Sequence, residues 1–415
     1  MVTEEKNKGF SKIAERAMKT GSFILNKGKM VDETTHHFAG LNTPKGEKTA
    51  LVLSGGGGKG AYECGVWRAL SELGIHLDMV VGVSIGALNA AMVVQKDPLL
   101  AEYLWHELET DALIDIKQNP TKKDFAMEFF RQGGADTSGM EKLLKRYGDD
   151  QALRASEIDL GILTVEFPSR KPLYIWKDDM PKGQIPDYIM ASASAFPAIK
   201  PHRIGDKEYI DGGYENNLPV AMAVEHGASD VIAVNLNVEG NFRREELSLP
   251  KNLVYITPRW DLGGFLDFDT ENSCRIMRLG YFDCMKIYDV FEGNRFTFVK
   301  GTFEEKMYSY ADAAGMMFEM DPLVLYSRQS FFEALKNCLS DLEEDTAAME
   351  KDLKKIRPET IKEMFTKLNR KTFTIIMARD LKEKKQKSVF WSPRARKFLE
   401  AFLPAAKFLI ANNLV

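Results

Sequence analysis

The sequence is poor in cysteine, and its cysteines are widely spaced. Only four of the 415 residues are cysteine, namely Cys64, Cys274, Cys284 and Cys338. A disulfide framework needs paired cysteines in a short chain, and a zinc site needs ligands a few residues apart, so this spacing favours neither. We therefore expect a protein of a reducing compartment, most simply the cytoplasm, without a metal site.

The sequence also lacks a surplus of basic residues and a long apolar run. Its 56 Lys and Arg residues are outnumbered by 60 Asp and Glu residues, and they are not concentrated beside base-stacking aromatic residues. We expect no nucleic-acid partner for this reason. No stretch supplies the ~20 apolar residues that span a bilayer, and residues 1–46 carry no pattern of a secretory signal. The sequence thus predicts neither a transmembrane helix nor a Sec signal.

A serine between two glycines stands where an apolar run changes into a helical pattern. The apolar residues 79–83 predict a strand, and the small residues 87–91 predict a helix. Gly82 and Gly86 allow a tight turn that exposes the Ser84 hydroxyl at the helix N-terminus, where partial positive charge favours an anion. The pattern is typical of a nucleophile elbow for acyl transfer. An ordinary turn with a capping serine is the alternative.

The glycine-rich residues 54–60 follow a predicted strand at residues 50–53 and precede a helical pattern. A dinucleotide site is disfavoured because no acidic residue ends the next strand to hold a ribose. A Walker loop needs Ser or Thr after Lys59, and the companion motifs of a kinase loop are missing. What remains is a row of backbone N–H groups that can form an oxyanion hole. The candidate donors are Gly55, Gly56, Gly57 and Gly58.

A third motif is the Asp-Gly-Gly sequence at residues 211–213, which follows a predicted strand at residues 207–210. The next helix is expected to begin with Asn217 as its N-cap and Pro219 in its first turn. An aspartate on a glycine turn is most often turn chemistry. Its role therefore depends on which residues are available as a base for the serine.

Histidine is scarce, with six residues in the chain. Only His226 follows Asp211, the order that a Ser-acid-His triad usually has. We predict that His226 ends a helix against Gly227 and is structural, and that His202 lies in a loop. In the absence of a histidine base, Asp211 is the candidate general base for Ser84.

Together the three motifs resemble the patatin-like phospholipase family, whose members have a glycine-rich oxyanion loop, a serine elbow and an Asp-Gly-Gly or Asp-Gly-Ala motif in this order. The resemblance covers about residues 47–260. It implies a Ser–Asp dyad, no metal or other cofactor, and a phospholipid or other acyl-ester lipid as substrate. Ser54 and Lys59 depart from the aspartate and arginine that are common in the family. The residues of the three motifs are Gly55, Gly56, Gly57, Gly58, Lys59, Gly60, Gly82, Ser84, Gly86, Asp211, Gly212 and Gly213.

Predicted strands and helical patterns alternate along the middle of the chain, which predicts a three-layer α/β/α sandwich with a mostly parallel central sheet. We expect a polar N-terminal extension at residues 1–46, a catalytic domain at residues 47–260 and a mainly helical region at residues 261–415. Strands are expected near residues 50–54, 79–83, 160–166, 172–176, 207–210, 230–235 and 252–256.

Peripheral segments admit two interpretations each. Residues 111–147 are a candidate lid or an ordinary pair of helices. The apolar stripe at residues 10–18 and the basic, apolar residues 394–410 can provide peripheral membrane contact or can pack on their own domain. Residues 331–339 and 360–368 have the pattern of amphipathic helices, and residues 382–387 are a charged, solvated run. The sequence does not indicate an oligomeric state.

The motifs favour a lipid acyl hydrolase that works through an acyl-enzyme. One alternative is a non-catalytic module that binds a lipid or a phosphate in the glycine loop. Another is an acyltransferase related to the malonyl transferases, which carry a histidine before the serine where this chain has Val83.

Overall fold

The computed structural model describes residues 47–96, 98–107, 144, 148–238, 240–265, 268–353, 369–383 and 399–415. The chain divides into two compact units, Met1–Cys284 and Met285–Val415, and the boundary falls within helix α11 (Thr270–Ile287). The candidate motifs all belong to the first unit. The three segments predicted from the sequence stay a prediction, and the first of them, residues 1–46, lies outside the described residues.

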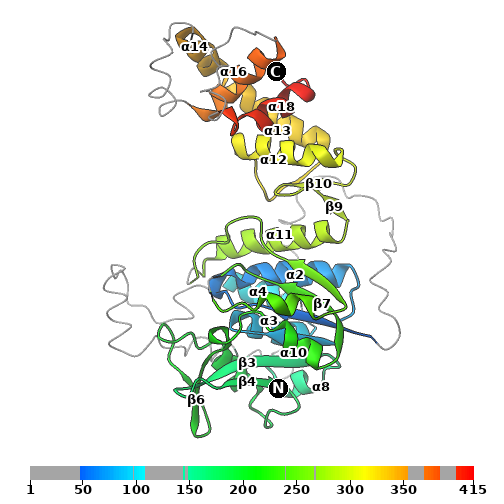
Figure 1. Cartoon of the computed structure of the whole chain (residues 1–415), viewed down its shortest axis with the longest axis vertical. Helices are drawn as coiled ribbons and strands as arrows, with labels where there is room; N and C mark the ends of the chain where they lie inside the picture. Colours follow the sequence, from blue (N-terminus) through cyan, green and yellow to red (C-terminus); the bar gives the residue numbers. More distant parts are fainter. Residues whose placement is uncertain are drawn as a thin grey trace, which may run out of the picture. The chain divides into compact units, whose positions relative to one another are not determined.

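An eight-stranded mixed sheet forms the centre of the first unit (Figure 1). Its strand order is β5-β6-β3-β2-β1-β7-β8, and β4 also pairs with β3. The run from β3 to β8 is parallel, whereas β4, β5 and β6 are antiparallel to their neighbours. The strands are β1 (Lys48–Leu53), β2 (Met79–Gly82), β3 (Asp159–Phe167), β4 (Pro172–Trp176), β5 (His202–Ile204), β6 (Lys207–Asp211), β7 (Ala228–Val234) and β8 (Asn252–Ile256).

Both faces of the central strands are buried. Ala50 and Val52 of β1 pack in one apolar cluster with residues of α10 (Val220–Glu225). Side chains alternate along a strand, so Leu51 and Leu53 point to the opposite face, where they are also fully buried. Continuous apolar strands of this kind are typical of a parallel sheet covered by helices on both sides. The other helices of the unit are α2 (Ala61–Glu72), α3 (Ile85–Val94), α4 (Pro98–Glu107), α8 (Asp150–Ala155) and α9 (Ile185–Ser192).

The predicted α/β fold class is confirmed, and all seven predicted strands are present. One strand of this sheet, β5, was missed. His202 begins β5 and its ring contacts Asp187 at 3.1 Å, so the prediction that it lies in a loop is wrong. The predicted lid or helix pair at residues 111–147 falls almost entirely outside the described residues.

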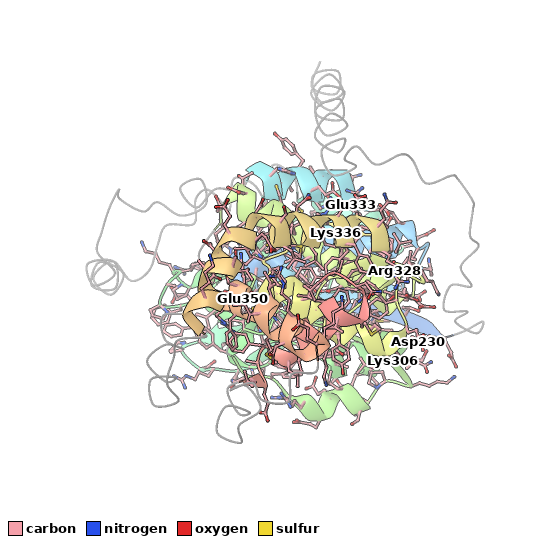
Figure 2. The ribbon with its side chains drawn as sticks, turned by 90° about the horizontal axis from the view of Figure 1, so that it is seen from above. Asp230, Lys306, Arg328, Glu333, Lys336 and Glu350 are labelled. Carbon is pink, nitrogen blue, oxygen red and sulfur yellow. The ribbon has the colours of Figure 1, made fainter. Side chains whose placement is uncertain are left out.

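The second unit is mainly helical, as predicted. Its helix α13 (Arg328–Asp341) buries Phe331, Leu335 and Leu339 at helical spacing, while its charged residues are exposed. Figure 2 labels three of these charged residues, Arg328, Glu333 and Lys336. The other elements are β9 (Phe291–Glu292), β10 (Thr297–Val299), β11 (Leu325–Tyr326), α12 (Tyr308–Met317), α14 (Glu343–Leu353), α16 (Arg370–Lys382) and α18 (Leu403–Ala411).

The last helix, α18, is part of the core of the second unit. Phe408 and Leu409 are fully buried, and the Phe408 ring packs edge-on against Phe303 and Phe331 at centroid distances of 5.6 and 5.9 Å. These side chains therefore do not form a membrane anchor, which corrects that interpretation for α18. Residues 10–18, 360–368 and 384–398 lie outside the described residues. Among the helices that the structure describes, none has the length and apolar character needed to cross a bilayer.

Candidate active site

Ser84 occupies a strained backbone conformation between β2 and α3. Its φ of 56° and ψ of −127° are unusual for a residue with a side chain, and such strain is concentrated at functional sites. A Cβ on Gly82 would lie 2.3 Å from the Gly86 carbonyl oxygen, and one on Gly86 would lie 2.6 Å from the carbonyl oxygens of Leu53 and Ser54. The turn therefore needs both glycines, as the sequence predicts.

The side chain of Ser84 is hydrogen-bonded to the carboxylate of Asp211. Both residues are only 6% exposed. Burial raises the pKa of Asp211 from its usual 3.8 to about 6, although hydrogen bonds from Ser84 and from the Gly213 N–H group oppose the shift. A carboxylate with this pKa is ionised at neutral pH and is a better base than an ordinary aspartate.

The backbone around Asp211 is fixed by the end of the sheet. Asp211 is the last residue of β6 and pairs with Thr164 of β3, and its N–H group donates to the Ser194 carbonyl at 2.9 Å. The turn that follows passes so close to β3 that a Cβ on Gly212 would lie 2.1 Å from the Leu163 carbonyl oxygen. Residue 212 must therefore be glycine, as the Asp-Gly-Gly motif predicts.

The end of α9 holds the serine elbow in place through hydrogen bonds. Ser192, at the end of α9, accepts a hydrogen bond from the Ser84 N–H group at 3.0 Å and donates one to the Leu163 carbonyl at 2.7 Å. Ser192 is fully buried. The small-residue segment at residues 191–197 thus fixes the elbow through Ser192 and the base through the carbonyl of Ser194.

The four glycines expected to form the oxyanion hole differ in their hydrogen bonds. The N–H group of Gly55 donates to Asn217 Oδ1 at 3.1 Å, and that of Gly58 donates to the Phe265 carbonyl at 2.8 Å. No acceptor among the described residues takes the N–H groups of Gly56 and Gly57. Of the four predicted donors, Gly56 and Gly57 therefore remain the candidates. Lys59 and Gly60 continue this segment as the short helix η1 (Gly57–Gly60).

Close packing explains why the loop consists of glycine. Gly57 has a φ of +58°, and a Cβ there would lie 2.0 Å from the Phe265 carbonyl oxygen. A Cβ on Gly56 would lie 2.4 Å from Leu236 Cδ1, and one on Gly55 would lie 2.9 Å from Ser84 Cβ. The loop thus packs directly against the serine elbow.

Asn217 has a different role from the predicted one. The N-cap of α10 is Pro219, which provides no side-chain cap, and the Ala221 N–H group donates instead to Glu246 Oε2 at 2.9 Å. The carboxamide of Asn217 binds the glycine loop, because it accepts from the Gly55 N–H group and donates to the Gly55 carbonyl at 3.2 Å. The prediction of Asn217 as a cap is wrong.

A buried polar cluster joins the serine helix α3 to the end of the glycine loop. Asn89 donates to the Gly60 carbonyl at 3.0 Å and to Glu63 Oε2 at 2.8 Å, and it accepts from the Trp105 indole at 3.0 Å. Burial raises the pKa of Glu63 well above its usual value. No local sequence pattern indicates this cluster, because Asn89 and Trp105 lie far along the chain from Gly60 and Glu63.

His226 is structural, as the sequence predicts. It ends α10, and Gly227 follows with a φ of +98°. Its Nε2 atom lies 2.7 Å from Asp159 Oδ2, and its ring stacks on Trp176. Asp159 begins β3, whereas Asp211 pairs with the second half of that strand. Within the part of the chain that the structure describes, no group of three His, Cys, Asp or Glu residues could hold a metal ion.

A comparison with protein families agrees with this arrangement. Residues 51–224 match the family model described as patatin-like phospholipase, and this range contains the glycine loop, Ser84 and Asp211. Residues 51–224 are therefore a patatin-like phospholipase domain. The family resemblance of the motifs is confirmed.

Relatives of the patatin-like domain are found among much longer proteins. Lysophospholipase nte1 of Aspergillus terreus is 27% identical over 194 residues, which cover 46% of this chain and 12% of that protein. Patatin-like phospholipase domain-containing protein 7 of Mus musculus is 26% identical over 195 residues, or 46% of this chain and 14% of that protein. The chain thus spans a small part of the length of these relatives.

Two solved structures align with most of the chain at 15% identity and low TM-scores. VipD from Legionella pneumophila has a TM-score of 0.40 over 89% of this chain and 85% of that chain. The type III effector protein ExoU has a TM-score of 0.33 over 87% of this chain and 74% of that chain.

Proposed function

We propose that the patatin-like domain is a lipid acyl hydrolase that uses Ser84 as nucleophile and Asp211 as general base. The observation that carries the proposal is the hydrogen bond between the Ser84 side chain and a buried carboxylate whose pKa is raised to about 6. The comparisons support hydrolysis of lipids as the type of reaction, because the relatives are named as phospholipases and lysophospholipases.

In the first half-reaction, the Ser84 Oγ atom attacks the carbonyl carbon of an ester while Asp211 takes the hydroxyl proton. The N–H groups of Gly56 and Gly57 donate hydrogen bonds to the oxyanion that forms. The tetrahedral intermediate then collapses. Its C–O bond to the alcohol breaks, and the proton on Asp211 passes to the departing alkoxide, which leaves Ser84 acylated.

In the second half-reaction, water attacks the acyl-serine and Asp211 takes a proton from this water. The same two N–H groups hold the second oxyanion, and collapse returns the proton to Ser84 and releases a fatty acid. The same dyad performs both steps without a further base or cofactor. The substrate is a phospholipid or another acyl-ester lipid, reached by a peripheral contact with a membrane, and the compartment is the cytoplasm.

Two alternative functions make different products. An acyltransferase would pass the acyl group from Ser84 to an acceptor alcohol, and a binding module would release nothing. The residue before the serine is Val83, where malonyl transferases carry histidine, and this favours hydrolysis over transfer.

The test is to incubate the purified chain with p-nitrophenyl butyrate and with lysophosphatidylcholine micelles, with and without glycerol as acyl acceptor. We expect free fatty acid from both substrates and no product from the Ser84→Ala variant. Acyl-glycerol in place of fatty acid would identify a transferase. If the wild-type protein releases no more product than Ser84→Ala, the proposed hydrolase is wrong.

A further inference from the structure

We infer that Asn217 is a positioning residue that holds the glycine loop in its catalytic conformation. Its side chain forms two hydrogen bonds with the same residue, since Oδ1 accepts from the Gly55 N–H group at 3.1 Å and Nδ2 donates to the Gly55 carbonyl at 3.2 Å. This pair fixes the orientations of both peptide groups of Gly55. Because the carbonyl of Gly55 belongs to the peptide whose N–H group is that of Gly56, Asn217 orients a proposed oxyanion donor directly. The inference rests on the proposed function.

Gly55 is wedged between Asn217 and the proposed nucleophile. A Cβ on Gly55 would lie 2.5 Å from Asn217 Oδ1 and 2.9 Å from Ser84 Cβ. Asn217, Gly55 and Ser84 are thus packed in a row. The loop cannot move toward or away from Ser84 without changing its contact with Asn217. Displacement of catalytic groups by about 1 Å can lower a rate by ~10²-fold, so this contact is important for catalysis.

Asn217 is itself held in place. It is 9% exposed, and its N–H group donates to the Asn241 carbonyl at 2.7 Å. A Cβ on Gly213 would lie 2.9 Å from Asn217 Oδ1 and 3.1 Å from Asp211 Oδ1, which places the carboxamide beside the turn that carries the proposed base. Among the described residues, the side-chain hydrogen bonds of Asn217 go only to Gly55. It therefore connects the base turn to the oxyanion loop without bonding to either member of the dyad.

The chain offers a matched control in the preceding residue. Asn216 is also buried, but its side chain donates to Glu246 Oε1 at 2.9 Å and accepts from the Leu218 N–H group at 3.2 Å. The Asn216→Ala change thus removes a buried carboxamide from the same turn without removing a hydrogen bond to the glycine loop. It measures the effect of general destabilisation of this segment.

The test compares Asn217→Ala and Asn216→Ala on p-nitrophenyl butyrate, with rates expressed per mole of folded protein. For Asn217→Ala we expect kcat to fall about 10–100-fold and KM to change less than about 3-fold. The acid limb of the pH–activity profile, where activity falls below about pH 6 as Asp211 is protonated, should stay in place. For Asn216→Ala we expect a lower Tm with kcat within about 2-fold of wild type. Equal kcat losses in the two variants would show that Asn217 is merely structural.

Asn217→Asp gives a second, charge-dependent result. The aspartate can still accept from the Gly55 N–H group, but it cannot donate to the Gly55 carbonyl, and it places a negative charge near Asp211. We expect a lower kcat together with an acid limb moved to higher pH, because a neighbouring negative charge disfavours ionisation of Asp211. An unchanged limb with wild-type kcat would contradict the inference.

Hydrogen exchange separates failure of this inference from failure of the proposed function, because it needs no turnover. Exchange of a peptide containing residues 54–60 should be faster in Asn217→Ala than in wild type, and unchanged in Asn216→Ala. If wild type shows no Ser84-dependent turnover but the exchange result holds, only the proposed function is wrong. If wild type is active and exchange and kcat of Asn217→Ala equal those of wild type, the inference about Asn217 is wrong.

Discussion

Ser84 and Asp211 are joined by a side-chain hydrogen bond although they lie far apart in the sequence of the patatin-like domain. Ser84 follows the parallel strand β2, and Asp211 ends β6, which is antiparallel to β3. β3 pairs with β2 along its first half and with β6 along its second half, so that the ends of β2 and β6 meet beside it. This topology brings the proposed nucleophile and base together without a histidine between them.

The pKa of Asp211 predicts the acid limb of the activity profile. Asp211 accepts a proton only when it is ionised, and its pKa is raised to about 6 by burial. We therefore expect kcat/KM for p-nitrophenyl butyrate to rise tenfold per pH unit below about pH 6 and to level off above it. A pH series with a soluble ester measures this limb. A limb near pH 4 would show that Asp211 is solvated or is not the base.

Asp211→Asn should lower activity and raise stability. We expect kcat to fall about 10²–10⁴-fold, because asparagine cannot take the serine proton. Burial raises the pKa of Asp211 from 3.8 to about 6, so the ionised group costs on the order of 3 kcal/mol of folding free energy above pH 6 and nothing below its unfolded pKa. The variant should therefore have a higher Tm than wild type at pH 8, and the difference should be much smaller at pH 4, close to the unfolded pKa of Asp211. A lower Tm at pH 8 would argue against this electrostatic account.

Much of this site could be predicted from short motifs, since the elbow, the glycine loop and Asp211 each depend on local backbone demands. Gly82 is required by a contact with Gly86 in the same turn, whereas Gly86 and Gly212 are required by close contacts with the backbone of other strands, although the motifs that contain them are short. Which of the loop glycines have an N–H group without an acceptor among the described residues could not be predicted in this way. The N–H groups of Gly55 and Gly58 are taken by Asn217 and Phe265, which lie far along the chain.

His226→Ala tests whether a histidine takes part in the chemistry. The side chain contacts Asp159 and stacks on Trp176, so we expect a loss of about 1 kcal/mol in the free energy of unfolding. Activity should stay within about 2-fold of wild type. Urea denaturation and ester kinetics on the same preparation measure both effects. A loss of activity as large as that of Asp211→Asn would instead support a Ser-Asp-His triad.

Phe408→Ala tests the assignment of α18 to the core of the second unit. The ring is fully buried and contacts three other aromatic rings, so its removal should cost about 3–5 kcal/mol of unfolding free energy in that unit. Lys407→Ala, at an exposed position of the same helix, should change stability by less than about 0.5 kcal/mol. Equal stability of the two variants, with weaker liposome binding for Phe408→Ala, would restore the membrane-anchor interpretation.

Side-chain partners were less predictable than elements. The pattern Asn217, Leu218, Pro219 is typical of a helix start, but Glu246 caps α10 from another segment and leaves Asn217 to bind Gly55. Similarly, β5 is only three residues long and forms by pairing with β6, which no local apolar pattern indicates. Local sequence thus predicted the motifs, whereas their mutual contacts depend on the fold.

The most direct measurement of the central claim is covalent labelling with a fluorophosphonate probe, mapped by mass spectrometry. An activated serine should react with the probe, so we expect one modified peptide, which carries the adduct on Ser84. Labelling should be abolished in Ser84→Ala, greatly slowed in Asp211→Asn, and unchanged in His226→Ala. Folding of each variant is checked by circular dichroism. Wild-type labelling in Ser84→Ala, or an adduct on another serine, would contradict Ser84 as the nucleophile.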